Sequence, residues 1–118
     1  MKRFMVLYQI PPSVMDEWKH KPSDERKDAE DKMSREIQAW TSGRGKLFTD
    51  RGAGLGRAKR ITSSGVSDAR NALAMYAVVQ GESQDAVAKA FESHPHLQIP
   101  QSSIEVMELF ALPDQPKK

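Results

Sequence analysis

The stretch from Ser83 to Leu112 decides the fold of this chain: residues 83–97 read SQDAVAKAFESHPHL and residues 103–112 read SIEVMELFAL. The first part has the apolar spacing of an amphipathic helix, with Ser83 as its cap and Pro95 as its stop. The second part has the apolar positions of a strand on both faces. A helix that leads directly into a closing strand is typical of an α+β fold.

Hydrophobic periodicity predicts further elements on either side of this stretch. We expect strands over residues 2–10 and 72–79, a helix over residues 23–42 with Ser23 as its N-cap and Gly43 as its stop, two short strands within residues 46–63, and a turn over residues 65–71. The order matches the ferredoxin-like βαββαβ plan, in which two helices cover one face of an antiparallel sheet. We therefore expect one domain over residues 1–112, followed by a flexible tail over residues 113–118.

The expected strands are apolar on both of their faces. Residues 2–10 place Phe4, Val6 and Tyr8 on one face and Met5 and Leu7 on the other. A sheet that is covered by helices on one side only would show polar residues on its second side. Because an exposed apolar face of that extent is costly in water, we expect a homodimer whose two sheets pack against each other.

Composition limits the possible chemistry. The chain has no cysteine, which excludes thiol catalysis, disulfides and thiolate-ligated metals. Its net charge is only +2, although residues 44–60 hold six basic residues against one acid and are rich in glycine. This segment suits a small anionic ligand, and the competing interpretation is a solvated loop and edge strand with ordinary surface charge. Phe48 is its one aromatic residue, so we do not expect nucleic acid to be a partner. No apolar run approaches the length of a membrane span, and we expect no membrane partner and a cytoplasmic location.

Four short stretches, taken in order, resemble one known family. They are KRFMVLY at residues 2–8, GKLFTDRGAGLG at 45–56, HPHL at 94–97 and SIEVMEL at 103–109. Together they resemble YCII-related proteins, and in particular the bacterial DGPF-like branch. The resemblance spans the chain to Leu112 and implies a ferredoxin-like protomer in a dimeric α+β barrel.

The resemblance also bears on catalysis. It implies that enzymatic members pair a histidine of the first helix with the aspartate of an Asp-Pro step after the second helix. Here His94-Pro95 matches the Asp-Pro step, and the position of the first-helix histidine falls near Ser34. The Asp-Gly-Pro-Phe motif of the branch is replaced by residues 65–68, which read GVSD. The acid-base pair of the family is therefore not carried over as a pair.

Five residues are the candidates for a functional site. His94 is a candidate general acid or base, because an imidazole titrates near neutral pH, but a cap on the C-terminus of the preceding helix is the competing structural interpretation. His96 is a candidate ligand contact or an exposed loop residue. Arg51 and Arg57 are candidates for holding an anionic group, and Tyr8 for pointing its hydroxyl into a barrel cavity, although tyrosines in apolar strands are usually core.

Metal and cofactor chemistry have little support in the sequence. His94 and His96 have Glu92 or Glu105 nearby, but no third ligand stands at a suitable spacing and His20 belongs to another segment, so we expect no metal and no cofactor.

Two functions remain open. The first is a non-catalytic module that binds a small ligand or has a regulatory role; the alternative is a small-molecule enzyme, a lyase, isomerase or hydrolase, with His94 as general acid or base.

Overall fold

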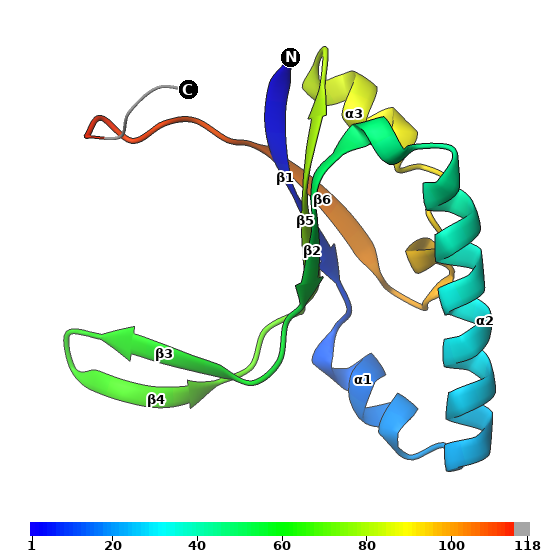
Figure 1. The fold of residues 1–118 in the computed structure, drawn as a ribbon. Helices are drawn as coiled ribbons and strands as arrows, with labels where there is room; N and C mark the ends of the chain where they lie inside the picture. Colours follow the sequence, from blue (N-terminus) through cyan, green and yellow to red (C-terminus); the bar gives the residue numbers. More distant parts are fainter. Residues whose placement is uncertain (115–118) are drawn as a thin grey trace.

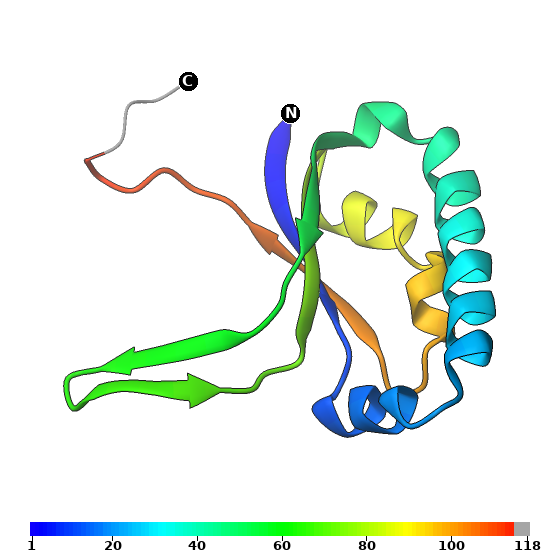
Figure 2. The same ribbon diagram turned by 60° about the horizontal axis from the view of Figure 1, so that its bottom comes forward.

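The computed structural model describes residues 1–114 and has an α+β architecture built on antiparallel strands (Figure 1). Its elements in chain order are β1 (Lys2–Gln9), α1 (Pro12–Lys19), α2 (Ser23–Ser42), η1 (Gly45–Leu47), β2 (Phe48–Gly54), β3 (Ala58–Thr62), β4 (Gly65–Ala69), β5 (Leu73–Gly81), α3 (Gln84–Ala90), η2 (Pro95–Gln98) and β6 (Ser103–Glu108). The three α-helices lie on one side of the main sheet in both ribbon views (Figures 1 and 2).

The main sheet has the strand order β2-β5-β1-β6, and all of its neighbouring strands are antiparallel. The connection from β1 to β2 runs through α1 and α2 and passes over β5. The connection from β5 to β6 runs through α3 and passes over β1. Strands β1 and β5 therefore form the centre of the sheet, and the candidate residue Tyr8 lies on a central strand.

The core forms where the helices cover the sheet. Phe4, Val6 and Tyr8 of β1 are buried on this face, and Val6 stands opposite Ala77 while Phe4 stands opposite Val79. The helices complete the cluster with three buried side chains, Trp40, Val87 and Phe91. The strand predicted over residues 2–10 and its buried face are thus confirmed.

The second face of the same sheet carries a group of apolar side chains, and no helix of the described residues lies over it (Figures 1 and 2). Cross-strand register groups Met5 with Val78 and with Met107, and Leu7 lies two residues along from Met5 on the same face. Met107 keeps 51% of its surface exposed. The expectation that the strands are apolar on both sides is confirmed for β1 and β5, whereas β6 places Glu105 opposite Leu7 on this face. We call Met5, Leu7, Val78 and Met107 the open face.

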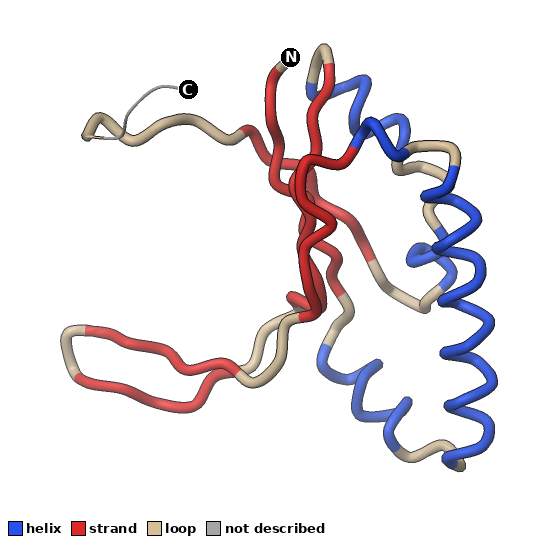
Figure 3. Tube along the Cα trace, viewed as in Figure 1, coloured by secondary structure: helices blue, strands red, loops and turns tan. Residues whose placement is uncertain are grey.

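The turn predicted over residues 65–71 is wrong. Residues Gly65–Ala69 form β4, which pairs with β3 in a separate two-stranded sheet that projects away from the main sheet (Figure 3). The pairing runs from Ala58 opposite Ala69 to Thr62 opposite Gly65. Strand β4 is short and contains Val66 as its one residue with high strand propensity, so its formation depends on cross-strand pairing with β3 rather than on a pattern of its own.

Three smaller expectations also need correction. Ser23 is the first residue of α2 instead of its cap, because the N-cap position belongs to Pro22. Strand β6 ends at Glu108, so Phe110, expected on a strand face, lies beyond the strand. Ala86, expected in the buried stripe of α3, is exposed. Of the predicted flexible tail, residues 115–118 lie outside the described residues.

Candidate functional site

His94 stands at the turn between α3 and η2, where its side chain caps the second of these elements. Its Nδ1 accepts a hydrogen bond of 3.0 Å from the backbone N–H of His96, which places His94 at the N-cap of η2. Pro95 fills the first position of η2, where proline is favoured because no N–H is needed there. His94 therefore does not cap the C-terminus of α3 as the structural interpretation expected. Helix α3 already ends at Ala90, with Phe91 as its C-cap, so the expected stop at Pro95 is wrong and Pro95 instead begins η2.

His96 is buried, with 4% of its surface exposed, and the expectation of an exposed loop residue is wrong. Its Nε2–H donates a hydrogen bond of 3.0 Å to the backbone carbonyl of Gln9 in β1. Burial lowers the pKa of His96, against the opposing effect of its hydrogen bonds to the backbone of Gln9 and Ser103. The ring thus fastens η2 to the end of β1, and His96 is not among the residues that line the cleft described below.

Aromatic rings surround His94 on several sides. The ring centroid of His94 lies 4.6 Å from that of Trp40 and 5.1 Å from that of Tyr8, and its ring stacks on Phe91 at 5.9 Å. Trp40 Nε1–H also donates to the Ser93 hydroxyl at 3.1 Å, which joins the end of α2 to the turn before His94. His94 is 3% exposed, and its orientation is fixed by packing on three sides and by the cap.

This environment keeps His94 neutral. Burial, together with the smaller effects of the nearby His96 and the charge of Arg44, lowers the pKa of His94 to about 4. The cap acts in the same direction, because a nitrogen that accepts a backbone N–H must keep its lone pair. The single ring proton of neutral His94 therefore sits on Nε2.

A cleft of about 190 Å³ opens between the sheet and the C-terminal half of α2, and His94 lines it. Ile37 and Thr41 contribute from α2, four residues apart and therefore on one face of the helix. The sheet contributes residues from β1, β2 and β5. The remaining lining residues are Tyr8, Phe48, Arg51, Ala53, Gly54, Met75 and Tyr76. Three candidates from the sequence, Tyr8, Arg51 and His94, thus meet in one cleft.

Tyr8 presents a neutral phenol to this cleft. Burial raises the pKa of Tyr8 to about 12, although the positive charge of Arg51 opposes the shift. Tyr8 therefore remains protonated throughout the physiological range, and its hydroxyl can donate a hydrogen bond to a ligand.

Arg51 reaches the cleft from an irregular part of β2. Gly52 has φ +75°, and a Cβ there would lie 1.7 Å from the backbone oxygen of Tyr76, so only glycine fits. The Gly52 N–H is held by the Asp50 carboxylate at 2.8 Å, and the register of β2 against β5 shifts on both sides of Asp50. Arg51 lies in this bulge, with its guanidinium 5.4 Å from the centre of the Phe48 ring.

Arg57 lies elsewhere. It is exposed in the connection between β2 and β3 and is not among the residues that line the cleft. A larger hollow of about 400 Å³ lies between α3 and β6, but it contains none of the five sequence candidates. Within residues 1–114, no three histidine, cysteine or acidic side chains gather as a metal site would require, and no helix is both long and apolar enough to cross a membrane.

Comparison with protein-family models and with curated proteins finds no match for this chain. The functional interpretation therefore depends on the geometry of the cleft itself.

Three of the polar groups that line the cleft can donate hydrogen bonds to a ligand. Arg51 supplies a positive charge, and the Tyr8 hydroxyl and the Nε2–H of His94 supply neutral donors. Among the described residues that line the cleft there is no aspartate or glutamate. Phe48, Met75 and Ile37 provide apolar surface beside these donors. Such a site suits a ligand that combines an anionic group with an apolar body. The sequence analysis did not identify Ile37 and Thr41 of α2 as lining residues. Their spacing of four residues, which places them on one face of the helix, was the available signal.

Because the pKa of His94 is about 6.5 in the unfolded chain and about 4 in the folded protein, the unfolded state binds more protons between these pH values. The free energy of unfolding therefore keeps its full value, as far as His94 is concerned, above pH 6.5. It decreases as the pH falls toward 4, and the decrease linked to His94 amounts to about 3 kcal/mol. We predict that His94→Asn, which keeps a capping oxygen but does not titrate, reduces this pH dependence.

Urea unfolding of both proteins between pH 8 and pH 4 checks this prediction. His96 is present in both chains, so the difference between the two curves belongs to position 94. Equal losses of stability in both proteins over this range would show that His94 is not held neutral by the fold.

Proposed function

We propose that this chain is a YCII-related, ferredoxin-like protomer that works as a non-catalytic module and binds a small organic anion in the cleft beside His94. The order β2-β5-β1-β6 with its two helical crossovers supports the ferredoxin-like plan. The observation that carries the functional part is the hydrogen bond from the His96 N–H to His94 Nδ1, because it turns His94 into a donor.

The anion is recognised by three groups in this proposal. Arg51 pairs with its charge, and the His94 Nε2–H and the Tyr8 hydroxyl donate hydrogen bonds to its oxygen atoms. Arg44 adds positive potential, since its charge also lowers the pKa of His94. The apolar body of the ligand packs on Phe48 and on neighbouring side chains of the cleft.

The alternative, an enzyme with His94 as general acid or base, stays a prediction that this geometry does not favour. A general base needs a free lone pair, but Nδ1 accepts the His96 N–H and Nε2 carries the proton. A general acid needs a ring that is protonated near neutral pH, whereas burial lowers the pKa of His94 to about 4. Catalysis through His94 would therefore require the cap to break, which costs about 1 kcal/mol before any chemistry.

Benzoate is a suitable probe for the cleft, because it joins a carboxylate to a flat apolar ring. We predict that benzoate binds to the full chain and that Arg51→Gln weakens its binding at least tenfold, since a charge-assisted hydrogen bond is lost. NMR titration of the backbone amides measures both the affinity and the place of binding. Arg57→Gln is the matched control and leaves the affinity unchanged, because Arg57 is outside the cleft.

Three results would contradict the anion-binding proposal. They are a lack of benzoate binding, an affinity that Arg51→Gln does not change, and an equal loss in both arginine variants. The last result would indicate general attraction to a basic surface instead of a site.

We also propose that two copies pack through the open face and so form a dimeric α+β barrel. Support comes from Met5, Leu7, Val78 and Met107, which form an apolar surface on the side of the sheet that no helix covers (Figure 2). Burial of such a surface is worth about 25 cal/mol for each Å² of apolar area.

We predict that the chain sediments as a dimer and that Leu7→Asp increases its dissociation constant at least a hundredfold, because each interface would then bury two carboxylates. Sedimentation equilibrium measures the change, and circular dichroism checks that the variant is folded. Ser34→Asp, on an exposed position of α2, is the control and leaves the dimer intact. A monomeric parent chain, or a Leu7→Asp dimer as tight as the parent, would refute the dimer.

A further inference from the structure

Strands β3 and β4 form a hairpin arm, defined here as residues 55–71, that projects from the main sheet on the side opposite the helices (Figures 1 and 2). Lys59, Asp68, Ile61 and Val66 share one face of this arm, because Lys59 stands opposite Asp68 and Ile61 opposite Val66. Ile61 is 77% exposed and Val66 is 67% exposed. An isolated two-stranded hairpin is only marginally stable in water, and an apolar pair near its tip needs a cover.

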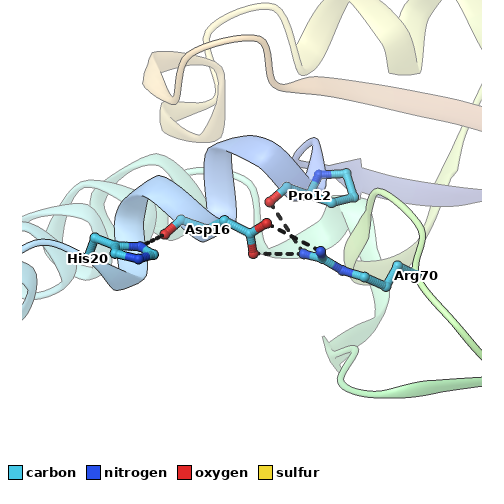
Figure 4. Close-up of polar contacts among 4 residues, drawn as sticks. All are labelled: Pro12, Asp16, His20 and Arg70. Carbon is cyan, nitrogen blue, oxygen red and sulfur yellow. Dashed lines mark hydrogen bonds and ion pairs between the residues drawn. The ribbon is translucent and has the colours of Figure 1, made fainter.

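Hydrogen bonds to α1 nevertheless fix the base of the arm relative to the rest of the fold. Arg70 donates to the two carboxylate oxygens of Asp16 at 2.8 and 3.3 Å and to the carbonyl of Pro12 at 3.5 Å (Figure 4). The hydrogen bond from Arg70 lowers the pKa of the Asp16 carboxyl group. The backbone adds a bond of 2.7 Å from Ile10 to Ala72. The arm is therefore anchored to α1 and β1, and its projection is built into the fold.

The arm is long enough to reach a second copy on the open face. Five residues of strand span roughly 16 Å, whereas two packed sheets lie about 10 Å apart. If a second sheet covers the open face, the arm extends beyond that sheet and must contact the second copy. The arm and the open face lie on the same side of the main sheet, away from the helices (Figure 1). A second copy on the open face would therefore lie beside the arm.

The C-terminal segment, residues 103–114, offers the matching surface. Beyond β6 it leaves the sheet on the same side as the arm but from the opposite end, in both ribbon views (Figures 1 and 2). Phe110 in this segment is 81% exposed, and Leu109 is also exposed. A twofold axis between two packed sheets can exchange these two ends, so that the arm of each copy meets the C-terminal segment of the other.

Charge favours the same match. The arm has four basic residues and one acidic residue, but Lys59 pairs with Asp68 and Arg70 with Asp16, so its excess positive charge is carried by Arg57 and Arg60. The C-terminal segment has three acidic residues and no basic one. Glu105 and Glu108 stand in β6 opposite Leu7 and Phe4, and Asp114 follows the exposed apolar residues next to the arm's proposed contact. Oppositely charged surfaces steer association and fix the orientation of partners.

We propose that each arm grips the C-terminal segment of a second copy, with Ile61 and Val66 against Leu109 and Phe110. This inference depends on the proposed homodimer and adds a second, reciprocal contact at each end of its interface. The arm then has a function of its own, which is to fix the relative orientation of the two sheets.

The test combines a variant in the arm with directed cross-linking of the full chain. We predict that Ile61→Ser/Val66→Ser raises the dimer dissociation constant at least tenfold in sedimentation equilibrium. The control, Thr62→Ser/Ser67→Ala, changes the opposite face of the same hairpin and leaves the constant unchanged. Because the chain has no cysteine, a short bismaleimide should join a Val66→Cys chain to a separately tagged Phe110→Cys chain, but should not join copies of either variant alone.

The outcomes separate the two proposals. A monomeric parent chain overturns both the homodimer and the arm contact. A dimer that Leu7→Asp weakens but Ile61→Ser/Val66→Ser does not, or a mixture in which Val66→Cys and Phe110→Cys chains are not joined, overturns the arm contact alone.

Discussion

The hydrogen bond from the His96 backbone N–H to His94 Nδ1 connects the parts of the structure that form the site. It starts η2 directly after the turn that follows α3, and this turn brings His96 to the carbonyl of Gln9 in β1. It also holds the His94 ring against Trp40 and Tyr8, at the border of the cleft. Because the accepted N–H occupies Nδ1, the same bond determines which nitrogen carries the proton and hence what the ring can offer to a ligand.

Replacing a carboxylate by an imidazole at this position has a simple electrostatic consequence. The aspartate that the family resemblance implies for enzymatic members could accept the same backbone N–H, since aspartate is a favoured N-cap. It would also bring a negative charge, which could pair with a histidine of the first helix. His94 keeps the capping acceptor but removes that charge, so that Arg51 faces a neutral donor. In the proposed relationship to this family, the exchange would turn a site suited to proton transfer into one suited to an anion.

Regular hydrophobic patterns predicted most of the fold, whereas features that depend on distant contacts were missed. The strand that carries Phe4, Val6 and Tyr8 and the helix that ends at Ser42 follow from local periodicity. Strand β4 was missed because polar residues gain their extended form from pairing with β3. Tyr8 and Arg51, which the sequence offered as candidates, both line the cleft. The burial of His96 depends on Gln9, 87 residues away, and no local pattern indicates it.

The tautomer of His94 tests the central claim most directly. Imidazole nitrogen chemical shifts, measured by two-dimensional ¹⁵N NMR on the labelled chain, distinguish a protonated from an unprotonated ring nitrogen. At pH 6.5 the structure predicts one neutral form for His94, with a proton on Nε2 and none on Nδ1. A proton on Nδ1, or a positively charged ring at this pH, would contradict the capping bond and the donor role in anion binding that follows from it.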